Sequence, residues 1–362
     1  VAAAVVDGEV VPGDVTVDDG MIAAVGVAPA GGRGLAVAGF VDLQVNGFAG
    51  IDFTHADTAG YATALTAMAR HGVTTCLPTI PTAAPDAYDT VLDVLAAVVA
   101  APPPGTRVLG AHLEGPFLAP ARHGAHRADR LRPPDVDLLA GWMARAPVAL
   151  VTLAPELPGA IGLVAAARRA GAVVSVGHSD ATAAEAHAAF DAGATMVTHL
   201  WNAQRTLTAR EPGVTGVALA RSDVHVGLIA DLVHVAADTV LVSLAAAGRR
   251  AFVVTDALDL AGLPPGRYRR GDGRDQHSDG TAVRLDDGVL AGSVLTLDAA
   301  LRNLAGLGIA VVDALDLVTA APARALGRDD LGRLGAGRRA DVVVLDDRLE
   351  IRSVLVGGTP AA

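Results

Sequence analysis

Short apolar runs alternate with alanine-rich stretches of helical length through the middle of the chain. The runs are rich in Val, Leu, Ile and Thr, which is typical of strands buried on both faces of a parallel sheet. The apolar runs lie at residues 39–45, 73–78, 108–113, 148–153, 173–176, 195–198, 226–230 and 252–255. The helix-like stretches lie at residues 61–70, 87–100, 161–170, 182–192 and 239–248. Eight strands with intervening helices predict an α/β chain built on a closed (β/α)8 barrel of the TIM type, with an open doubly wound sheet as the alternative.

The two ends of the chain follow a different pattern. Residues 1–38 and 334–362 alternate apolar and polar positions between Gly turns, which predicts antiparallel strands. We expect these two segments to pair into one small β-sandwich domain, with residues 39–333 forming the barrel domain. Residues 264–280 are rich in Gly, Arg and Asp, so we expect a surface loop or a mobile flap there.

Composition narrows the classes of partner. The net charge of -11 and the 3% share of aromatic residues argue against a nucleic-acid partner, which would favour basic and aromatic clusters. A membrane span is not expected, because Gly, Pro, Asp or Arg interrupts each apolar segment before it is long enough. The lone cysteine, Cys76, lies in an apolar run and cannot form an internal disulfide, which fits a packing role in a reducing compartment. We therefore expect a cytoplasmic protein with a small-molecule substrate.

Polar side chains gather where the apolar runs stop, and in a parallel barrel these strand ends form one rim. His178 and His199 each follow a run, and one predicted helix separates them, so they would end neighbouring strands about 4.8 Å apart. Glu114 ends a strand two units earlier and can supply an oxygen ligand from across the barrel mouth. Each histidine alone could be a hydrogen-bonded rim residue, but a His2Glu set with open positions is typical of a catalytic divalent metal site.

Asp256 ends the last predicted barrel strand. A carboxylate facing the metal can take a proton from water and return it to a leaving amine, although a helix N-cap is the alternative role. A nucleophilic serine or cysteine is disfavoured, because the chain has no Gly-x-Ser-x-Gly motif. The glycine motifs of nucleotide-binding loops are also missing. The residues at the strand ends therefore indicate metal-dependent hydrolysis of an amide.

Nine short motifs run along almost the whole chain. They are residues 38–47 (AGFVDLQVNG), 112–117 (HLEGPF), 124–126 (GAH), 153–156 (LAPE), 177–179 (GHS), 198–203 (THLWNA), 210–213 (REPG), 254–257 (VTDA) and 290–293 (LAGS). In this order they resemble the N-acetylglucosamine-6-phosphate deacetylases of the amidohydrolase superfamily.

The resemblance implies an enzyme that removes acetate from N-acetylglucosamine 6-phosphate and leaves glucosamine 6-phosphate. A metal-bound water would attack the acetyl carbonyl, with Asp256 as general base and then as general acid. The family's metal ligands fall on Glu114, His178 and His199, and one divalent ion per subunit (Zn, Fe, Mn or Co) is implied. His126 matches a residue that polarises the acetyl carbonyl, with an ordinary loop histidine as the alternative.

The resemblance also implies the substrate contacts and an assembly. The substrate-binding positions are Ala125, Asn202, Ala203, Arg210, His234, Leu290, Ala291, Gly292 and Ser293. Arg210 and His234 would bind the phosphate, and a guanidinium suits a phosphate dianion. In the family some of these groups reach across a dimer interface, so a homodimer with a shared phosphate site is implied. A surface ion pair with Glu211 is the alternative role for Arg210.

Departures from the family pattern leave some points open. Gln44 and Asn46 stand where many superfamily members carry two histidines, so a single-metal site is favoured. Leu232 and Gln204 also depart from the expected residues, which bears on the sugar contacts. A deaminase or cyclic-amide hydrolase is the rival enzyme, disfavoured by the scarcity of aromatic stacking groups. An inactive barrel that acts as a scaffold is the other rival, disfavoured by the intact ligands and acid. The sequence leaves open the metal and the choice between the glucosamine and galactosamine epimers.

Overall fold

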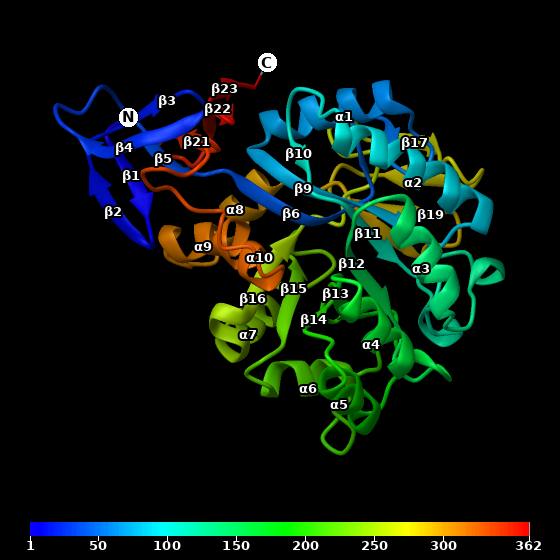
Figure 1. Cartoon of the computed structure of the whole chain (residues 1–362). Helices are drawn as coiled ribbons and strands as arrows, with labels where there is room; N and C mark the ends of the chain where they lie inside the picture. Colours follow the sequence, from blue (N-terminus) through cyan, green and yellow to red (C-terminus); the bar gives the residue numbers. More distant parts are fainter. Residues whose placement is uncertain (362) are drawn as a thin grey trace.

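The structure, a computed structural model, describes residues 1–361 and centres on a parallel barrel surrounded by helices (Figure 1). The barrel strands, in chain order, are β6 (Phe40–Val45), β9 (Val73–Pro81), β11 (Ala111–Glu114), β12 (Val148–Leu153), β13 (Val173–Val176), β14 (Met196–Val197), β15 (His225–Ile229) and β16 (Ala251–Val254). Each pairs in parallel with the next, and Val45 forms a parallel bridge with Ala257 just beyond β16. The last strand thus returns beside the first, which confirms the expected barrel over an open sheet.

Helices cover the outside of the barrel because their apolar faces pack on strands that are themselves buried. The helices are α1 (Thr58–Arg70), α2 (Pro85–Ala100), α3 (Val136–Arg145), α4 (Ala160–Arg169), α5 (Ala183–Asp191), α6 (Gly213–Ala220), α7 (Ala237–Ala247), α8 (Leu297–Gly306), α9 (Val311–Val318) and α10 (Ala320–Ala325). Short 3-10 turns lie at Pro120–Arg122, Ala128–Arg130 and Gly248–Arg250. Among the described helices, none has the length and apolarity that crossing a lipid bilayer requires.

The two ends of the chain meet in one sheet beside the barrel, where Figure 1 places both termini. The order of this six-stranded sheet is β2 (Glu9–Pro12), β1 (Ala3–Val6), β5 (Leu35–Ala38), β21 (Val342–Leu345), β22 (Ile351–Val356) and β23 (Thr359–Pro360). A hairpin of β3 (Asp14–Asp18) and β4 (Met21–Val27) packs with it around Ile22 and Val342. We propose that these terminal strands form one small β-sandwich domain, and its boundaries near residues 38 and 334 stay a prediction.

A buried carboxylate joins the first and last barrel strands. The side chain of Asp42 in β6 accepts hydrogen bonds from the Thr255 hydroxyl (2.6 Å) and from the Thr255 and Gln44 amides (3.3 and 3.2 Å). Burial raises the pKa of Asp42 to about 7, although these hydrogen bonds act in the opposite direction and lower it. Because Thr255 precedes Asp256 and Gln44 lies near the end of β6, this carboxylate fixes the strand ends on which two polar residues of the rim stand.

The expectation of a surface loop at residues 264–280 is wrong. This segment contains two strands of a four-stranded antiparallel sheet, here called the flap sheet: β17 (Gly266–Arg269), β18 (Asp275–Ser278), β19 (Ala282–Leu285) and β20 (Leu290–Ser293). In β18, Gln276 and Ser278 are buried whereas the residues between and before them are exposed. The exposed face carries the charged residues, so composition alone suggested a loop.

A second, smaller difference concerns residues 108–113. The expected strand is divided into β10 (Arg107–Val108) and β11, with Gly110 between them at φ 156°. The two parts contact β9 at different places, because β10 pairs with Thr75 and Cys76 whereas β11 pairs with Thr79 onward. A hairpin of β7 (Gly47–Phe48) and β8 (Ile51–Asp52) completes the described strands.

Asp298 provides a stability test, because it links helices α1 and α8. Its mostly buried carboxylate accepts hydrogen bonds from His71 (3.2 Å) and Arg302 (2.9 Å). Burial alone would raise the pKa of Asp298, but the hydrogen bonds from His71 and Thr296 and the charge of Arg302 lower it to about 2. The folded pKa lies below the ordinary value of 3.8, so the ionised carboxylate stabilises the fold above about pH 4. This contribution is lost as the pH falls through 2.

We expect Asp298→Asn to lower the free energy of unfolding by about 1 to 2 kcal/mol at pH 7 and by less at pH 3. Urea unfolding at both pH values measures this difference. Asp286→Asn is the matched control, because Asp286 pairs with Arg267 on the solvent-exposed flap sheet and should change nothing at either pH. An equal loss at both pH values for Asp298→Asn would contradict the ionic origin of the stabilisation.

Candidate active site

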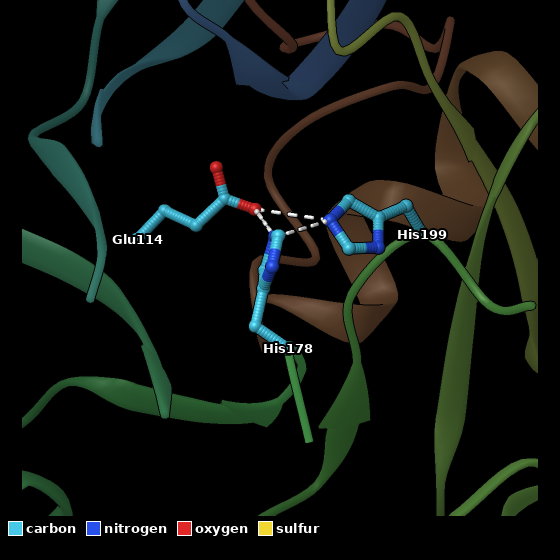
Figure 2. Close-up of side chains that lie close together, drawn as sticks. All are labelled: Glu114, His178 and His199. Atoms are coloured by element: carbon cyan, nitrogen blue, oxygen red, sulfur yellow. Dashed lines mark hydrogen bonds and ion pairs between the residues drawn. The ribbon is translucent and has the colours of Figure 1, made fainter. Parts of the chain in front are cut away.

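Three side chains meet at the carboxyl ends of β11, β13 and β14 (Figure 2). Glu114 Oε1 lies 3.2 Å from His178 Nε2 and 3.1 Å from His199 Nε2, and the two imidazole nitrogens are 3.0 Å apart. All three side chains are buried. Two imidazole nitrogens and a carboxylate oxygen at such spacing form a donor set that suits a divalent metal ion. The structure therefore brings together the three residues that the strand ends predicted.

The ionisation of His178 and Glu114 agrees with metal binding. For His199, burial alone would lower the pKa, but the carboxylate of Glu114 raises it when no cation is bound. Burial lowers the pKa of His178 to about 4, which favours the neutral imidazole that can act as a ligand. Burial alone would raise the pKa of Glu114, but the surrounding imidazoles hold it well below its ordinary value. The backbone carbonyl of Arg122 accepts the Nδ1–H of His178 at 2.9 Å, so the free electron pair of Nε2 points into the cluster.

The backbone at three rim residues is strained. His178, His199 and Asp256 have φ values of 48°, 30° and 48°, in the left-handed region that side chains other than glycine rarely adopt. Each residue follows a barrel strand closely, so this turn directs its side chain over the barrel mouth. Strain of this kind is maintained by the surrounding fold and is common where function fixes a side chain.

Asp256 stands beside the three side chains, and two amides hold one of its oxygens. Asn46 Nδ2 donates to Asp256 Oδ1 at 2.8 Å, and Gln44 Nε2 donates to the same oxygen at 3.2 Å and to Glu114 Oε1 at 2.9 Å. Burial and the charge of Glu114 raise the pKa of Asp256 to about 6. Because both amides bind Oδ1, the Oδ2 oxygen of Asp256 is available to accept and release a proton. A carboxyl group with a raised pKa suits this general acid–base role.

His126 lies on the other side of Glu114, with its Nε2 3.6 Å from Glu114 Oε2. The backbone N–H of Thr82 donates to Nδ1 of His126 at 3.2 Å, and the Thr82 hydroxyl lies 3.0 Å from the same nitrogen. A backbone N–H can only donate, so Nδ1 is the acceptor and the ring proton is on Nε2. His126 therefore presents an N–H donor toward the site.

A cavity of about 600 Å3 opens above this cluster. Its lining includes most of the residues that the sequence singled out: Glu114, Ala125, His126, His178, His199, Asn202, Ala203, His234, Asp256, Leu290, Ala291 and Gly292. The Nδ1–H of His234 donates to Asp231 Oδ2 at 2.6 Å, which orients its ring. Such a volume accommodates a small-molecule substrate.

Two of the predicted substrate contacts lie elsewhere. Ser293 is buried behind Asp256, where its amide donates to the Asp256 carbonyl (2.9 Å) and its hydroxyl donates to the Thr255 carbonyl (2.6 Å). Arg210 is exposed outside the cavity lining, and its guanidinium has no partner within residues 1–361. The carboxylate of Glu211 instead accepts the Ala183 and Gly213 amides, so the surface ion pair with Arg210 does not form.

Comparison with known proteins agrees with this geometry. The family model of the amidohydrolase family matches residues 35–361. The chain belongs to the amidohydrolase family. It is 36% identical to the N-acetylgalactosamine-6-phosphate deacetylase of Escherichia coli O157:H7 over 95% of the chain and 93% of that enzyme. It is also 36% identical to the N-acetylglucosamine-6-phosphate deacetylase of Homo sapiens, over 91% of the chain and 83% of that enzyme.

Solved structures of related deacetylases share this fold along the whole chain. The N-acetyl-D-glucosamine-6-phosphate deacetylase of Mycobacterium smegmatis, solved in complex with N-acetyl-D-glucosamine-6-phosphate, superposes with a TM-score of 0.94 at 32% identity. The match covers 100% of the chain and 98% of that structure. The enzyme of Thermotoga maritima superposes with a TM-score of 0.92 at 30% identity, over 100% and 98%.

The structure adds residues that the sequence did not assign to the site. Gln44 and Asn46 stand where many superfamily members carry histidines, yet in this chain their N–H groups face carboxylates. Thr82 carried no signal in the sequence, because a threonine after a strand is common. Arg274 lies in the turn between β17 and β18, a segment outside the family motifs, and it lines the cavity. In the sequence, the amide side chains of Gln44 and Asn46 at the end of the first strand were the only local indication of these interactions.

Proposed function

We propose that this amidohydrolase hydrolyses the acetamide of N-acetylglucosamine 6-phosphate to glucosamine 6-phosphate and acetate. The observation that carries the proposal is the meeting of Glu114, His178 and His199 with Asp256 and His126 at one cavity. The relatives named for this reaction support it. Because a relative of similar identity is named for the galactosamine epimer, both epimers belong in the first assay.

The side chains divide the reaction between them. A divalent cation held by Glu114, His178 and His199 would supply Lewis-acid chemistry, polarising a carbonyl and lowering the pKa of water. Asp256 takes the proton from the attacking water at its free oxygen and then returns it to the sugar nitrogen as the C–N bond breaks. The Nε2–H of His126 donates to the carbonyl oxygen as negative charge develops there.

The phosphate would bind at the end of the cavity formed by Asn202, Ala203 and His234. Arg210 is exposed and unpaired within the described chain, which suits a residue that serves a neighbouring subunit. Leu207 and Val233 lie in adjacent loops and are 39% and 42% exposed, so this side of the barrel mouth offers apolar surface for a contact. The proposal therefore includes a homodimer in which Arg210 completes the partner's phosphate site.

The cellular location is a further part of the proposal. The single cysteine, Cys76, is a buried free thiol, and a sugar phosphate is a substrate of the cell interior. Both points favour the cytoplasm.

The function is tested by measuring acetate release from four sugars. These are N-acetylglucosamine 6-phosphate, its galactosamine epimer, and the two sugars without phosphate, each with and without chelator. We expect chelator-sensitive turnover of a phosphorylated sugar alone. Turnover of the galactosamine epimer in preference would move the proposal to that substrate. Metal-loaded protein without turnover of any of them would refute it in favour of another amidohydrolase reaction.

Arg210→Ala is expected to raise KM for the phosphorylated sugar about tenfold or more, because a charge-assisted phosphate contact is lost. Arg169→Ala, an exposed arginine at the end of α4, is the control. Co-expression of Arg210→Ala with Asp256→Asn subunits distinguishes the two arrangements. If Arg210 acts across the interface, the mixed dimer recovers a normal KM, because one site then has both Asp256 and the partner's Arg210. A mixed dimer that keeps the raised KM would show that Arg210 does not act across the interface.

A further inference from the structure

The flap sheet connects the two sides of the active site. At one end, β20 is hydrogen-bonded to the strand end that carries Asp256, through the amide of Ser293 and the carbonyl of Asp256 at 2.9 Å. At the other end, Arg274 Nη2 donates to the backbone carbonyl of Ala125 at 2.9 Å. That carbonyl belongs to the peptide group whose nitrogen is the amide of His126. The flap sheet thus contacts the backbone of both residues that the proposed reaction uses for proton transfer and carbonyl polarisation.

Arg274 is oriented by its own turn before it reaches Ala125. The carboxylate of Asp272 accepts hydrogen bonds from Nε and Nη2 of Arg274 at 2.9 and 2.6 Å, and also from the Arg274 amide at 3.1 Å. The amide of Arg270 donates to the Arg274 carbonyl at 2.8 Å and closes the turn. A guanidinium held by two hydrogen bonds within its own turn loses little further freedom when it binds the carbonyl.

An apolar contact accompanies the hydrogen bond. The side chain of Ala125 packs against the small core of the flap sheet, formed by Leu258, Leu260, Val283, Leu285 and Ala291. Ala125 is therefore held to the flap sheet by both its side chain and its carbonyl. Next to Ala125 the backbone hydrogen bond is a local one, from the His126 amide to the His123 carbonyl at 3.0 Å.

We propose that Arg274 is a positioning residue for His126. The inference rests on the proposed role of His126 at the acetyl carbonyl. Thr82 holds the ring through Nδ1, and Arg274 holds the peptide group that carries the residue, so Nε2–H keeps one direction over Glu114. Loss of Arg274 leaves the Thr82 and His123 contacts in place but removes the hydrogen bond that ties this peptide group to the flap sheet. Displacement of a reacting group by a fraction of an ångström slows a reaction.

The test is a double-mutant cycle between Arg274→Ala and His126→Ala. We expect Arg274→Ala alone to lower kcat about tenfold with little change in KM, metal content or Tm. In the His126→Ala background the same change should lower kcat less than about twofold, because the residue it positions is gone. Arg274→Lys, which retains a charged N–H donor group, should recover part of kcat. Arg267→Ala, on the same flap sheet but paired with Asp286 at the surface, is the control and should match the parent.

Hydrogen–deuterium exchange provides a readout that does not depend on activity. Arg274→Ala should speed amide exchange in residues 123–127, and Arg267→Ala should not. Equal loss of kcat in both backgrounds, or unchanged kcat and exchange, would overturn the proposal. If the parent protein hydrolyses no acetamide, the proposed function is wrong, whatever the variants show. The exchange experiment still tests the positioning role in that case, because unchanged exchange in Arg274→Ala would show that Arg274 does not hold the backbone at His126. A fall in Tm for Arg274→Ala that Arg274→Lys does not recover would assign the residue to folding of the flap sheet and also overturn the proposal.

Discussion

Asp256→Asn is expected to lower kcat at least about a hundredfold while the protein folds and binds its metal as before. The amide oxygen of Asn can still accept the hydrogen bonds that Asn46 and Gln44 donate to Asp256 Oδ1. The other position becomes an NH2 group, which cannot take a proton from water. The change therefore removes proton transfer and preserves shape. Steady-state kinetics with the phosphorylated sugar, together with metal analysis and a melting curve, measures each part of this expectation.

Asp259→Asn is the matched control for that variant. Asp259 lies three residues further along the chain, accepts a hydrogen bond from Gln276 and is outside the cavity lining. Its replacement should change kcat little. If Asp256→Asn keeps activity within a few-fold of the parent, the carboxyl is not the general base, and a different group must accept the proton of the attacking water.

Removal of the metal is expected to abolish turnover and to lower thermal stability. An ion that binds only the folded state stabilises it by mass action, by about 2.7 kcal/mol at a free concentration one hundred times Kd. Dialysis against chelator should therefore lower Tm, and single additions of Zn, Fe, Mn or Co should restore both Tm and acetate release to different extents. The ion that gives the largest recovery at equal concentration is the best candidate for the native metal.

His199→Ala tests the ligand set directly. We expect this variant to lose most of its bound metal and at least about a thousandfold in kcat, because one of three ligands is missing. His187→Ala is the matched control, since His187 is an exposed histidine on α5. Parent-level metal content in His199→Ala would place the ion outside the cluster of Glu114, His178 and His199.

The local pattern of apolar and polar residues was sufficient to predict the barrel and the metal-ligating residues at its rim. Strands such as β12 and β13 begin and end where their apolar runs do, because a strand buried on both faces allows few polar residues. His178 and His199 could be paired because consecutive parallel strands lie side by side and their carboxyl ends face the same way. In these cases the interacting groups follow from strand order alone.

The flap sheet shows where local pattern was insufficient. Its strands are short, and one face of β18 carries charged residues toward solvent, so the sequence has the composition of a loop. The pairing of β17 with β18 is fixed by contacts across the turn at residues 270–274 and by an apolar core to which Leu258 and Ala291 contribute. Those contacts join segments that are separated in the sequence, so no local periodicity predicts them.

The sequence by itself determined the barrel, the set of Glu114, His178 and His199, and the place of Asp256, because strand order and periodicity bring these residues to one rim. Only the tertiary structure decided how that rim is held. The amides of Gln44 and Asn46 face carboxylates, Thr82 fixes the proton of His126 on Nε2, and Arg274 reaches Ala125 from 149 residues away in the chain. Hydrogen bonds of this kind depend on the direction of single donors across loops, and no periodicity in the sequence records that direction.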